Sequence, residues 1–364
     1  MPIADLQTGW LEGLKSGLER FLDSMKVEGH PGFYRYTRSG DLYGPNRNWG
    51  LANAVFATKI RYMIGDIGKA ERDDLTSFIS SFQKEDGYIF DAFLKRRAFI
   101  SQLKRFVRTL NPSGIRSHIG GELERAETRQ SIAALVMLGG KPRHPVSKIP
   151  RSKELVEKYL EALDWNNPWG AGSHFSHLLF FLHYNQVLFG QDENKDLIEH
   201  AIGWVGRLQS SEDGCWYRGK ISEQQKVNGA MKVMTGLDAA HKLDGLRHVE
   251  KIIDTCLATV NDQEACSHFN VVYALYKCSL LSAHRREEIE RYAAQKLSDY
   301  RDYYYPESGG FSFNKHRSGT HYLGAKLSKG FHEPDIHGTV MFLFGITLIS
   351  KVLDFDLGLR EPIS

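Results

Sequence analysis

Apolar residues recur with helical spacing along most of the chain, and clusters of Gly, Asn, Asp and Pro separate the helical stretches. Alternating strand patterns joined by hairpin turns are scarce. This pattern predicts an all-α protein. One class of predicted helix is amphipathic and rich in charge, as expected for a helix with one solvated face. The helices of this class span residues 3–27, 71–83, 151–163, 195–209, 246–260 and 285–300.

A second class of predicted helix is apolar nearly all round and must therefore be buried. The segments of this class begin near residues 49, 128, 173, 228, 267 and 336. Each follows an amphipathic helix, so the order predicts six outer–inner hairpins that close into an (α/α)6 toroid, a single domain over residues 1–364. The ring puts all inner N-termini at one end, where we expect the active or binding site. The irregular spacing predicts insertions around residues 92–125 and 301–330.

Three loops between an outer and an inner segment share a Gly turn that is followed by an aromatic residue. They span residues 82–88, 208–216 and 305–311. Gly supplies the left-handed conformation that ends a helix, and the aromatic side chain can pack back onto the last turn. The recurrence of this turn indicates an internal repeat.

The Q-x-x-(x)-D-G-aromatic pattern of the first two loops resembles the repeats of the α/α-toroid superfamily. That superfamily includes terpenoid cyclases, protein prenyltransferase β-subunits, and the six-hairpin glycosidases, epimerases and polysaccharide lyases. The resemblance implies the toroid architecture over most of the chain. Because the motif is common to all these branches, it indicates a fold and not one reaction.

Two further segments resemble the zinc site of the prenyltransferases. Asp335-Ile336-His337-Gly338-Thr339 is similar to the segment that supplies the zinc histidine, and Asp213-Gly214-Cys215 is similar to the aspartate-x-cysteine that supplies two other ligands. However, Asp213 and Cys215 belong to a repeat turn here. The D-x-D-D and D-D-x-x-D acid motifs of the terpenoid cyclases are also missing from the sequence. We expect no metal and no cofactor.

Composition and charge bear on which partners the protein binds and in which compartment it is found. The 47 basic and 44 acidic residues give a net charge of +3, and we expect no nucleic-acid partner because we find no long basic tract with interleaved aromatic residues. Residues 1–14 have no basic stretch before an apolar core, and no apolar run approaches the roughly 20 residues that span a bilayer. We therefore expect a cytoplasmic protein without membrane insertion. The four cysteines form no C-x-x-C pair, which indicates reduced thiols.

The starts of the inner segments gather donors, acceptors and titratable groups above an apolar ring. Each buried polar group costs about 1 to 3 kcal/mol if it stays unpaired, so a polar ligand is the economical explanation. The candidate catalytic residues are His337, Asp335, Glu127, His174 and His268. The candidate substrate-binding residues are Trp49, Arg129, Gln130, Trp169, His177, Asn228, Lys232, Asn270 and His332.

The histidines are the sharpest signal, because imidazole exchanges a proton near neutral pH. His174 and His177 share a helix face, and the ring predicts that they surround one cavity together with His268 and His337. We expect His337 to carry more of the function than the acids of the repeat turns.

Two acids, Glu127 and Asp335, open inner helices and are expected to face the cavity; the alternative is that they cap those helices. Arg129 and Lys232 suit a carboxylate-bearing sugar or a phosphate. Trp169 and Trp49 can stack on sugar faces, with core packing as the alternative.

The leading hypothesis is a carbohydrate-active enzyme that works on a saccharide with uronic-acid units by hydrolysis, β-elimination or epimerisation. In elimination or epimerisation, Asn228 and Arg129 would neutralise the carboxylate while a histidine removes the C5 proton. In hydrolysis, Glu127 and Asp335 would act as the carboxyl pair. Two alternatives stay open: an isoprenoid cyclase or prenyltransferase-like enzyme, supported by 12% aromatic residues, and a non-catalytic binding protein.

Overall fold

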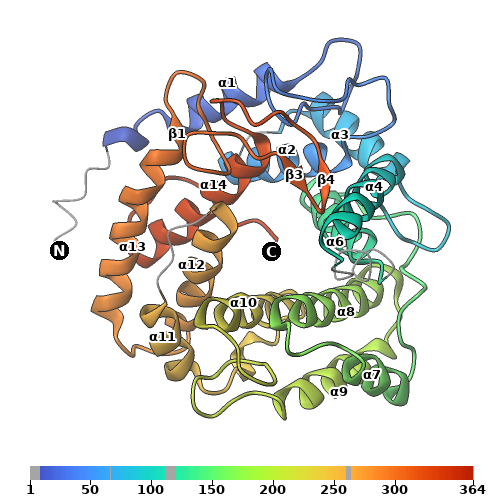
Figure 1. Cartoon of the computed structure of the whole chain (residues 1–364), viewed down its shortest axis with the longest axis vertical. Helices are drawn as coiled ribbons and strands as arrows, with labels where there is room; N and C mark the ends of the chain where they lie inside the picture. Colours follow the sequence, from blue (N-terminus) through green and yellow to red (C-terminus); the bar gives the residue numbers. More distant parts are fainter. Residues whose placement is uncertain (1–8, 66, 111–119, 260–263, 364) are drawn as a thin grey trace.

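The computed structural model describes residues 9–65, 67–110, 120–259 and 264–363. Over these ranges the chain is mostly α-helical, and its strands are two residues long (Figure 1). The prediction of an all-α protein is confirmed. Within the same ranges, no helix combines the length and the apolarity needed to cross a membrane.

The predicted inner segments form long, largely buried helices around a common centre (Figure 1). Each contacts the next along the chain, and the last contacts the first. They are α2 (Leu51–Ile64), α6 (Glu122–Met137), α8 (Pro168–Phe189), α10 (Glu223–Ala239), α12 (Ala265–Ser279) and α14 (Ile336–Val352). Three of them begin within two residues of the predicted position. The helices α6, α8 and α10 begin five or six residues earlier, because their first turns contain polar residues or Pro that apolar periodicity does not mark.

The amphipathic segments form shorter helices outside this circle. They are α1 (Leu14–Met25), α3 (Lys69–Ser81), α7 (Lys153–Glu161), α9 (Asn194–Gly206), α11 (Val249–Ala258) and α13 (Arg286–Tyr300). Each buries one face; in α1 the buried side chains include Leu14, Leu18 and Phe21. Residues 3–8 of the first predicted helix lie outside the described residues, and residues 9–11 form the short 3-10 helix η2 (Gly9–Leu11).

Both predicted insertions are present. The first contains α4 (Ala92–Thr109). The second contains η4 (Arg301–Tyr303), β1 (Tyr304–Tyr305), β2 (Gly310–Phe311), β3 (His321–Tyr322) and β4 (Ala325–Lys326). The strands pair as two antiparallel hairpins, β1 with β2 and β3 with β4. The helix α4 packs against β4, which joins the two insertions at one side of the ring. A further 3-10 helix, η3 (Leu243–Gly245), precedes α11.

The repeat turns have the same local structure in two hairpins. The Gln83 side chain donates to the carbonyl of Gly87 and to that of His144 in the next connection, and Gln209 donates in the same way to Gly214 and Arg247. Gly87 and Gly214 have φ values of 86° and 72°, which an L side chain rarely adopts. The conserved geometry within one chain supports the interpretation of these turns as an internal repeat.

The segment after α14, residues 354–363, crosses the end of the ring opposite to the inner N-termini. The N–H of Arg360 donates to the carbonyl of Met63 near the end of α2. Glu361 accepts hydrogen bonds from Lys277 of α12 and Lys351 of α14. The Nζ of Lys59 reaches the carbonyl of Ile363 at 3.2 Å. The C-terminal segment thus forms a base beneath the centre of the ring (Figure 1).

Candidate functional site

A cavity of about 600 Å³ lies inside the circle of inner helices. Its lining comes from all six inner helices and from the loop and hairpin that contain Phe313 and Tyr322. The lining begins at the first turns of α8, α12 and α14, at the end of the ring that we call the mouth. The position of the cavity agrees with the expectation from the sequence.

The structure brings eight of the candidate residues together around this cavity. They are His337, His174, His177, Arg129, Gln130, Trp169, Lys232 and Asn270. The other six candidates do not line it. They are Asp335, Glu127, His268, Trp49, Asn228 and His332.

Asp335 is fully buried and caps α14. Its carboxylate accepts hydrogen bonds from the backbone N–H groups of Gly338 at 2.8 Å, Phe313 at 2.7 Å and Gly319 at 2.8 Å. The expectation that it faces the cavity is wrong, and the capping alternative is correct. Burial raises the pKa of Asp335 to about 6, although its backbone hydrogen bonds oppose this rise.

Glu127 is buried behind the cavity wall. One carboxylate oxygen accepts a hydrogen bond of 2.7 Å from the backbone N–H of Asp91, and Asp91 in turn caps α4. Burial raises the pKa of Glu127 well above its usual value, and the nearby charge of Asp91 adds to the rise. Glu127 therefore tethers the start of α4, and the predicted carboxyl pair does not form at the cavity.

His268 and Asn228 lie on inner helices but do not line the cavity. The Nε2 atom of His268 is 3.2 Å from the hydroxyl of Tyr303, and its ring packs edge-on against Tyr300 of α13. The prediction that four histidines surround one cavity is therefore wrong for His268. Asn228 accepts a hydrogen bond of 2.8 Å from the side chain of Asn270, so it orients a residue that does line the cavity.

Trp49 and His332 do not line the cavity, so neither contacts a sugar bound there. Trp49 is buried, donates to the carbonyl of Gly44 at 2.9 Å, and packs edge-on against Phe33 and Tyr43. The core-packing alternative is therefore correct for Trp49. His332 is exposed beside Tyr305.

The cavity holds a cluster of cations, of which Lys59 was not predicted. Burial lowers the pKa of Lys59 to about 7 and that of Arg129 to about 10. Burial likewise lowers the pKa of Lys232 to about 8, and the positive charge of Arg129 lowers both lysine values further. Neither lysine forms an ion pair with a carboxylate in the part of the chain that the structure describes. The only signal in the sequence was that Lys59 is the one charged residue of the stretch LANAVFATKI.

Two histidines stand beside these cations on α8. Burial and the positive charge of Arg129 lower the pKa of His177 well below its usual value, so its imidazole is neutral. His174 lies nearer the mouth, with Nδ1 2.8 Å from the hydroxyl of Tyr159 and Nε2 3.1 Å from Arg125. Glu122, at the same side, is the one acid among the described lining residues.

His337 lies in a box of aromatic rings. It stacks between Phe56, with ring centroids 4.9 Å apart, and Phe313, at 4.7 Å, while Tyr322 packs edge-on at 5.4 Å. Burial lowers the pKa of His337 to about 3. At neutral pH its ring is therefore uncharged, so it can donate or accept a hydrogen bond but cannot act as a general acid in the resting site.

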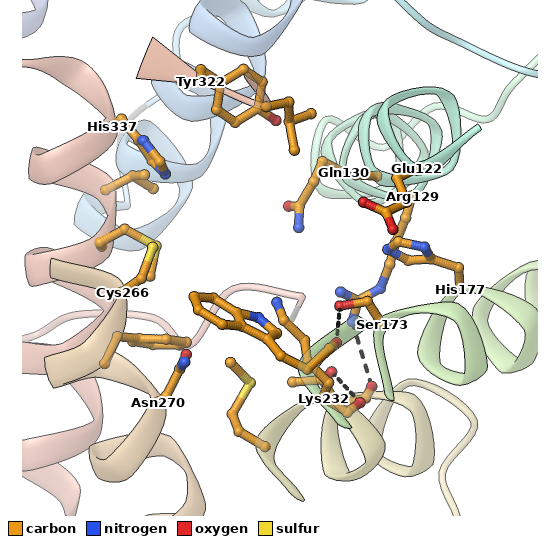
Figure 2. Close-up of a pocket in the computed structure, with 18 of the residues that line it drawn as sticks. Glu122, Arg129, Gln130, Ser173, His177, Lys232, Cys266, Asn270, Tyr322 and His337 are labelled. Atoms are coloured by element: carbon orange, nitrogen blue, oxygen red, sulfur yellow. Dashed lines mark hydrogen bonds between the residues drawn. The ribbon is translucent and has the colours of Figure 1, made fainter. Parts of the chain in front are cut away.

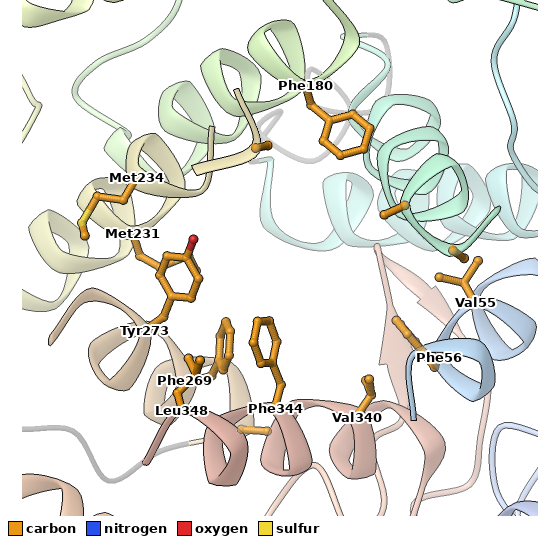
Figure 3. Packing of buried hydrophobic residues seen from close by; sticks show 14 of the residues in the cluster. Val55, Phe56, Phe180, Met231, Met234, Phe269, Tyr273, Val340, Phe344 and Leu348 are labelled. Carbon is orange, nitrogen blue, oxygen red and sulfur yellow. The ribbon is translucent and has the colours of Figure 1, made fainter. Parts of the chain in front are cut away.

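Figure 2 shows two facing walls. His337, Cys266 and Asn270 project from α14 and α12 on one side, and Gln130, Arg129 and His177 project from α6 and α8 on the other. Apolar rings, among them Phe56, Phe269 and Phe344, are also directed at the centre (Figure 3), and the Nζ of Lys59 reaches the C-terminal segment. A ligand of this cavity therefore meets charged and hydrogen-bonding groups as well as hydrocarbon.

The two segments that resemble a zinc site do not meet in the cavity. Cys215 is buried in its repeat turn and does not belong to the lining. Asp213 accepts from the N–H of Cys215 and pairs with Lys226 at 3.0 Å. Among the described residues no three His, Cys, Asp or Glu side chains are grouped closely enough to hold a metal ion.

Comparisons with protein-family models, with curated proteins and with solved structures found no match. The chemistry of the cavity is therefore the basis for assigning a function. Its main features are several buried cations, neutral imidazoles, and a single acid near the mouth.

Proposed function

We propose that this protein is a cytoplasmic carbohydrate-active enzyme with a closed (α/α)6 toroid fold. Its substrate is a saccharide with a uronic-acid unit, and the reaction removes the proton next to the carboxylate, by β-elimination or epimerisation. The observation that carries the proposal is the cluster of Lys59, Arg129 and Lys232 in a cavity where Glu122 is the one acid among the described lining residues.

An anionic ligand would relieve the repulsion within this cluster. Lys59 and Lys232 pair with no carboxylate among the described residues, and burying such a charge raises the free energy of the folded state, a cost that a bound anion compensates. Arg129 presents a planar fork of donors, which matches both oxygens of a carboxylate. Asn270, held by Asn228, supplies a further amide for the sugar hydroxyls.

The neutral His177 is the proposed base. Burial and the neighbouring cations lower the pKa of His177, so a bound carboxylate would raise that pKa toward the range of an effective base. In elimination, His177 takes the C5 proton, the electron pair forms the C4–C5 double bond, and the bond from C4 to the leaving oxygen breaks. Lys232, with its pKa lowered to about 8, is suited to give that oxygen a proton. In epimerisation, His177 takes the same C5 proton, and the carbanion left at C5 takes up a proton from solvent on its opposite face.

The buried positions of Glu127 and Asp335 favour these two reactions over hydrolysis. A hydrolase needs two carboxyl groups on either side of the scissile bond. Here both acids are engaged with backbone N–H groups outside the cavity. We therefore do not include hydrolysis by this pair in the proposal.

The apolar lining of the cavity favours one other candidate, an isoprenoid cyclase or prenyltransferase-like enzyme. Phe269, Phe344 and Met231 would contact a hydrocarbon chain while the cations bind its diphosphate. The proposal of a saccharide rests on the polar lining residues, whereas this alternative rests on the apolar ones.

The test uses the purified full chain with a panel of uronate oligosaccharides in deuterated buffer. Elimination creates a double bond conjugated with the carboxylate, which is detected as new far-ultraviolet absorbance, and epimerisation is detected by NMR as deuterium at C5. Native mass spectrometry with the same saccharides and with prenyl diphosphates reports binding. Retention of prenyl diphosphates alone would refute the saccharide proposal, and binding of a saccharide without turnover would identify a binding protein.

A further inference from the structure

The insertion helix α4 differs in composition from every other helix of the ring. Its sequence, AFLKRRAFISQLKRFVRT, contains six basic residues and no acid. Aromatic residues are interleaved with these charges, so the chain does contain the type of basic tract that we did not expect from the overall composition. Arg96, Lys104, Arg105 and Arg108 are exposed and form no ion pair with the described residues.

Apolar side chains form a stripe along the same helix. Phe99, Leu103 and Val107 recur every four residues and are 39%, 45% and 70% exposed, and Leu110 continues the line at 78%. Residues four apart lie on one face of a helix. We call these four residues the α4 stripe. Its exposure in water is unfavourable by about 25 cal/mol per Å² of apolar surface.

We propose that α4 docks this protein onto the surface of an anionic phospholipid bilayer, with the α4 stripe among the acyl chains and the flanking cations at the lipid phosphates. A basic amphipathic helix with an apolar face is the typical structure of such an interfacial anchor. The bilayer is the occupant that complements both features at once. A nucleic acid would satisfy the cations but leave the stripe in water.

The attachment of α4 also distinguishes a bilayer from a protein groove. One face of the helix is already packed: Leu94 and Ala98 are buried, and Gln102 lies against Gly324 before β4. A partner that encloses a helix in a groove would compete with this packing, whereas a flat bilayer requires only the exposed face. The same packing connects the anchor to the hairpin whose Tyr322 lines the cavity.

The test is co-sedimentation of the full chain with vesicles of phosphatidylcholine alone or mixed with phosphatidylserine. We expect binding to the mixed vesicles only, with weakening as salt is added. The variant K104E/R108E, which changes the two exposed cations beside Leu103 and Val107, should bind at least about 25-fold more weakly, since each basic residue near an anionic surface contributes about five-fold. The variant L103S/V107S should lose at least about 10-fold.

The matched controls are V187S on α8, where the side chain is 61% exposed, and K251E on α11. Both should bind like the natural chain, and circular dichroism should show all variants folded. Equal binding by the α4 variants, or no binding by the natural chain, would overturn the proposal. A dimer in solution that L103S/V107S abolishes would also overturn it, because a second copy would then cover the stripe.

Discussion

The carboxylates at the starts of the inner helices and the cations inside the ring occupy the same part of the molecule in opposite surroundings. Asp335 has three backbone N–H donors within 2.8 Å, whereas Lys232 pairs with no described carboxylate. A buried charge with a full set of donors stabilises the fold, and a buried charge without an opposite one needs a ligand. His337, only two residues after Asp335, lines the cavity together with these cations.

The largest effect should come from removing the proposed carboxylate fork. With a uronate substrate, Arg129→Met should lower kcat/KM by about 1000-fold, because loss of one partner of a buried charge pair costs about 4 kcal/mol. Steady-state kinetics with Arg207→Met on the outer face as control measures this. Unchanged kinetics in Arg129→Met would show that Arg129 does not bind the substrate and would contradict the ligand-binding role of the cations.

The next effect concerns the acids and stability. Asp335→Ala should lower the free energy of unfolding by about 4 kcal/mol, because it leaves three buried N–H groups without an acceptor. Urea denaturation compares it with Glu212→Ala, an exposed turn acid for which we expect a change below about 0.5 kcal/mol. Similar values for the two variants would show that Asp335 is not structural.

Replacing Lys59, which is 6% exposed, should change the free energy of unfolding in the opposite direction. Lys59→Met should raise the free energy of unfolding at neutral pH by roughly 2 kcal/mol, because an apolar side chain replaces a buried cation with a pKa lowered to about 7. The same variant should bind anionic ligands more weakly. Exposed Lys251→Met serves as control in thermal unfolding, and a destabilised Lys59→Met would contradict the assignment of Lys59 to the ligand region.

The smallest effect is a pH dependence of anion binding. Burial lowers the pKa of Lys59 to about 7 and of Lys232 to about 8, so these groups lose their charge as the pH rises through that range. Affinity for an anion should therefore fall by roughly 10-fold between about pH 6 and 9. Binding should also take up protons at neutral pH, because the anion raises both pKa values. Calorimetry in buffers of different ionisation enthalpy measures the uptake, and a flat profile would refute it.

The sequence was sufficient for the helices because burial of an entire helix leaves a plain signal. The segment that forms α14 is apolar on nearly every face, and the structure buries most of its residues. Because these helices are apolar on nearly every face, the sequence does not show which face of each helix turns toward the centre of the ring. His268 and Asn270 are two residues apart on α12, and no polar face in the sequence shows that only Asn270 turns toward the centre.

The candidate site was predicted in part for a related reason. Position at a helix start identified His337 and Asp335 alike, but it could not tell a backbone cap from a cavity residue. That distinction depends on the loop around Phe313, whose N–H occupies the Asp335 carboxylate. Lys59 is the ninth of the 14 residues of α2, far from its start, so a search of helix starts could not find it. The basic tract of α4 was obscured by averaging charge over the whole chain.

The segment at residues 354–363 closes the end of the ring opposite the mouth. A ring of helices alone is a tube with two openings, and here the base consists of a short stretch held by Glu361 and the backbone of Arg360 and Ile363. Wall and base are therefore separate parts. Changes in this stretch can alter how the ring is closed, and can reach the cavity through the contact between Ile363 and Lys59, without repacking any helix.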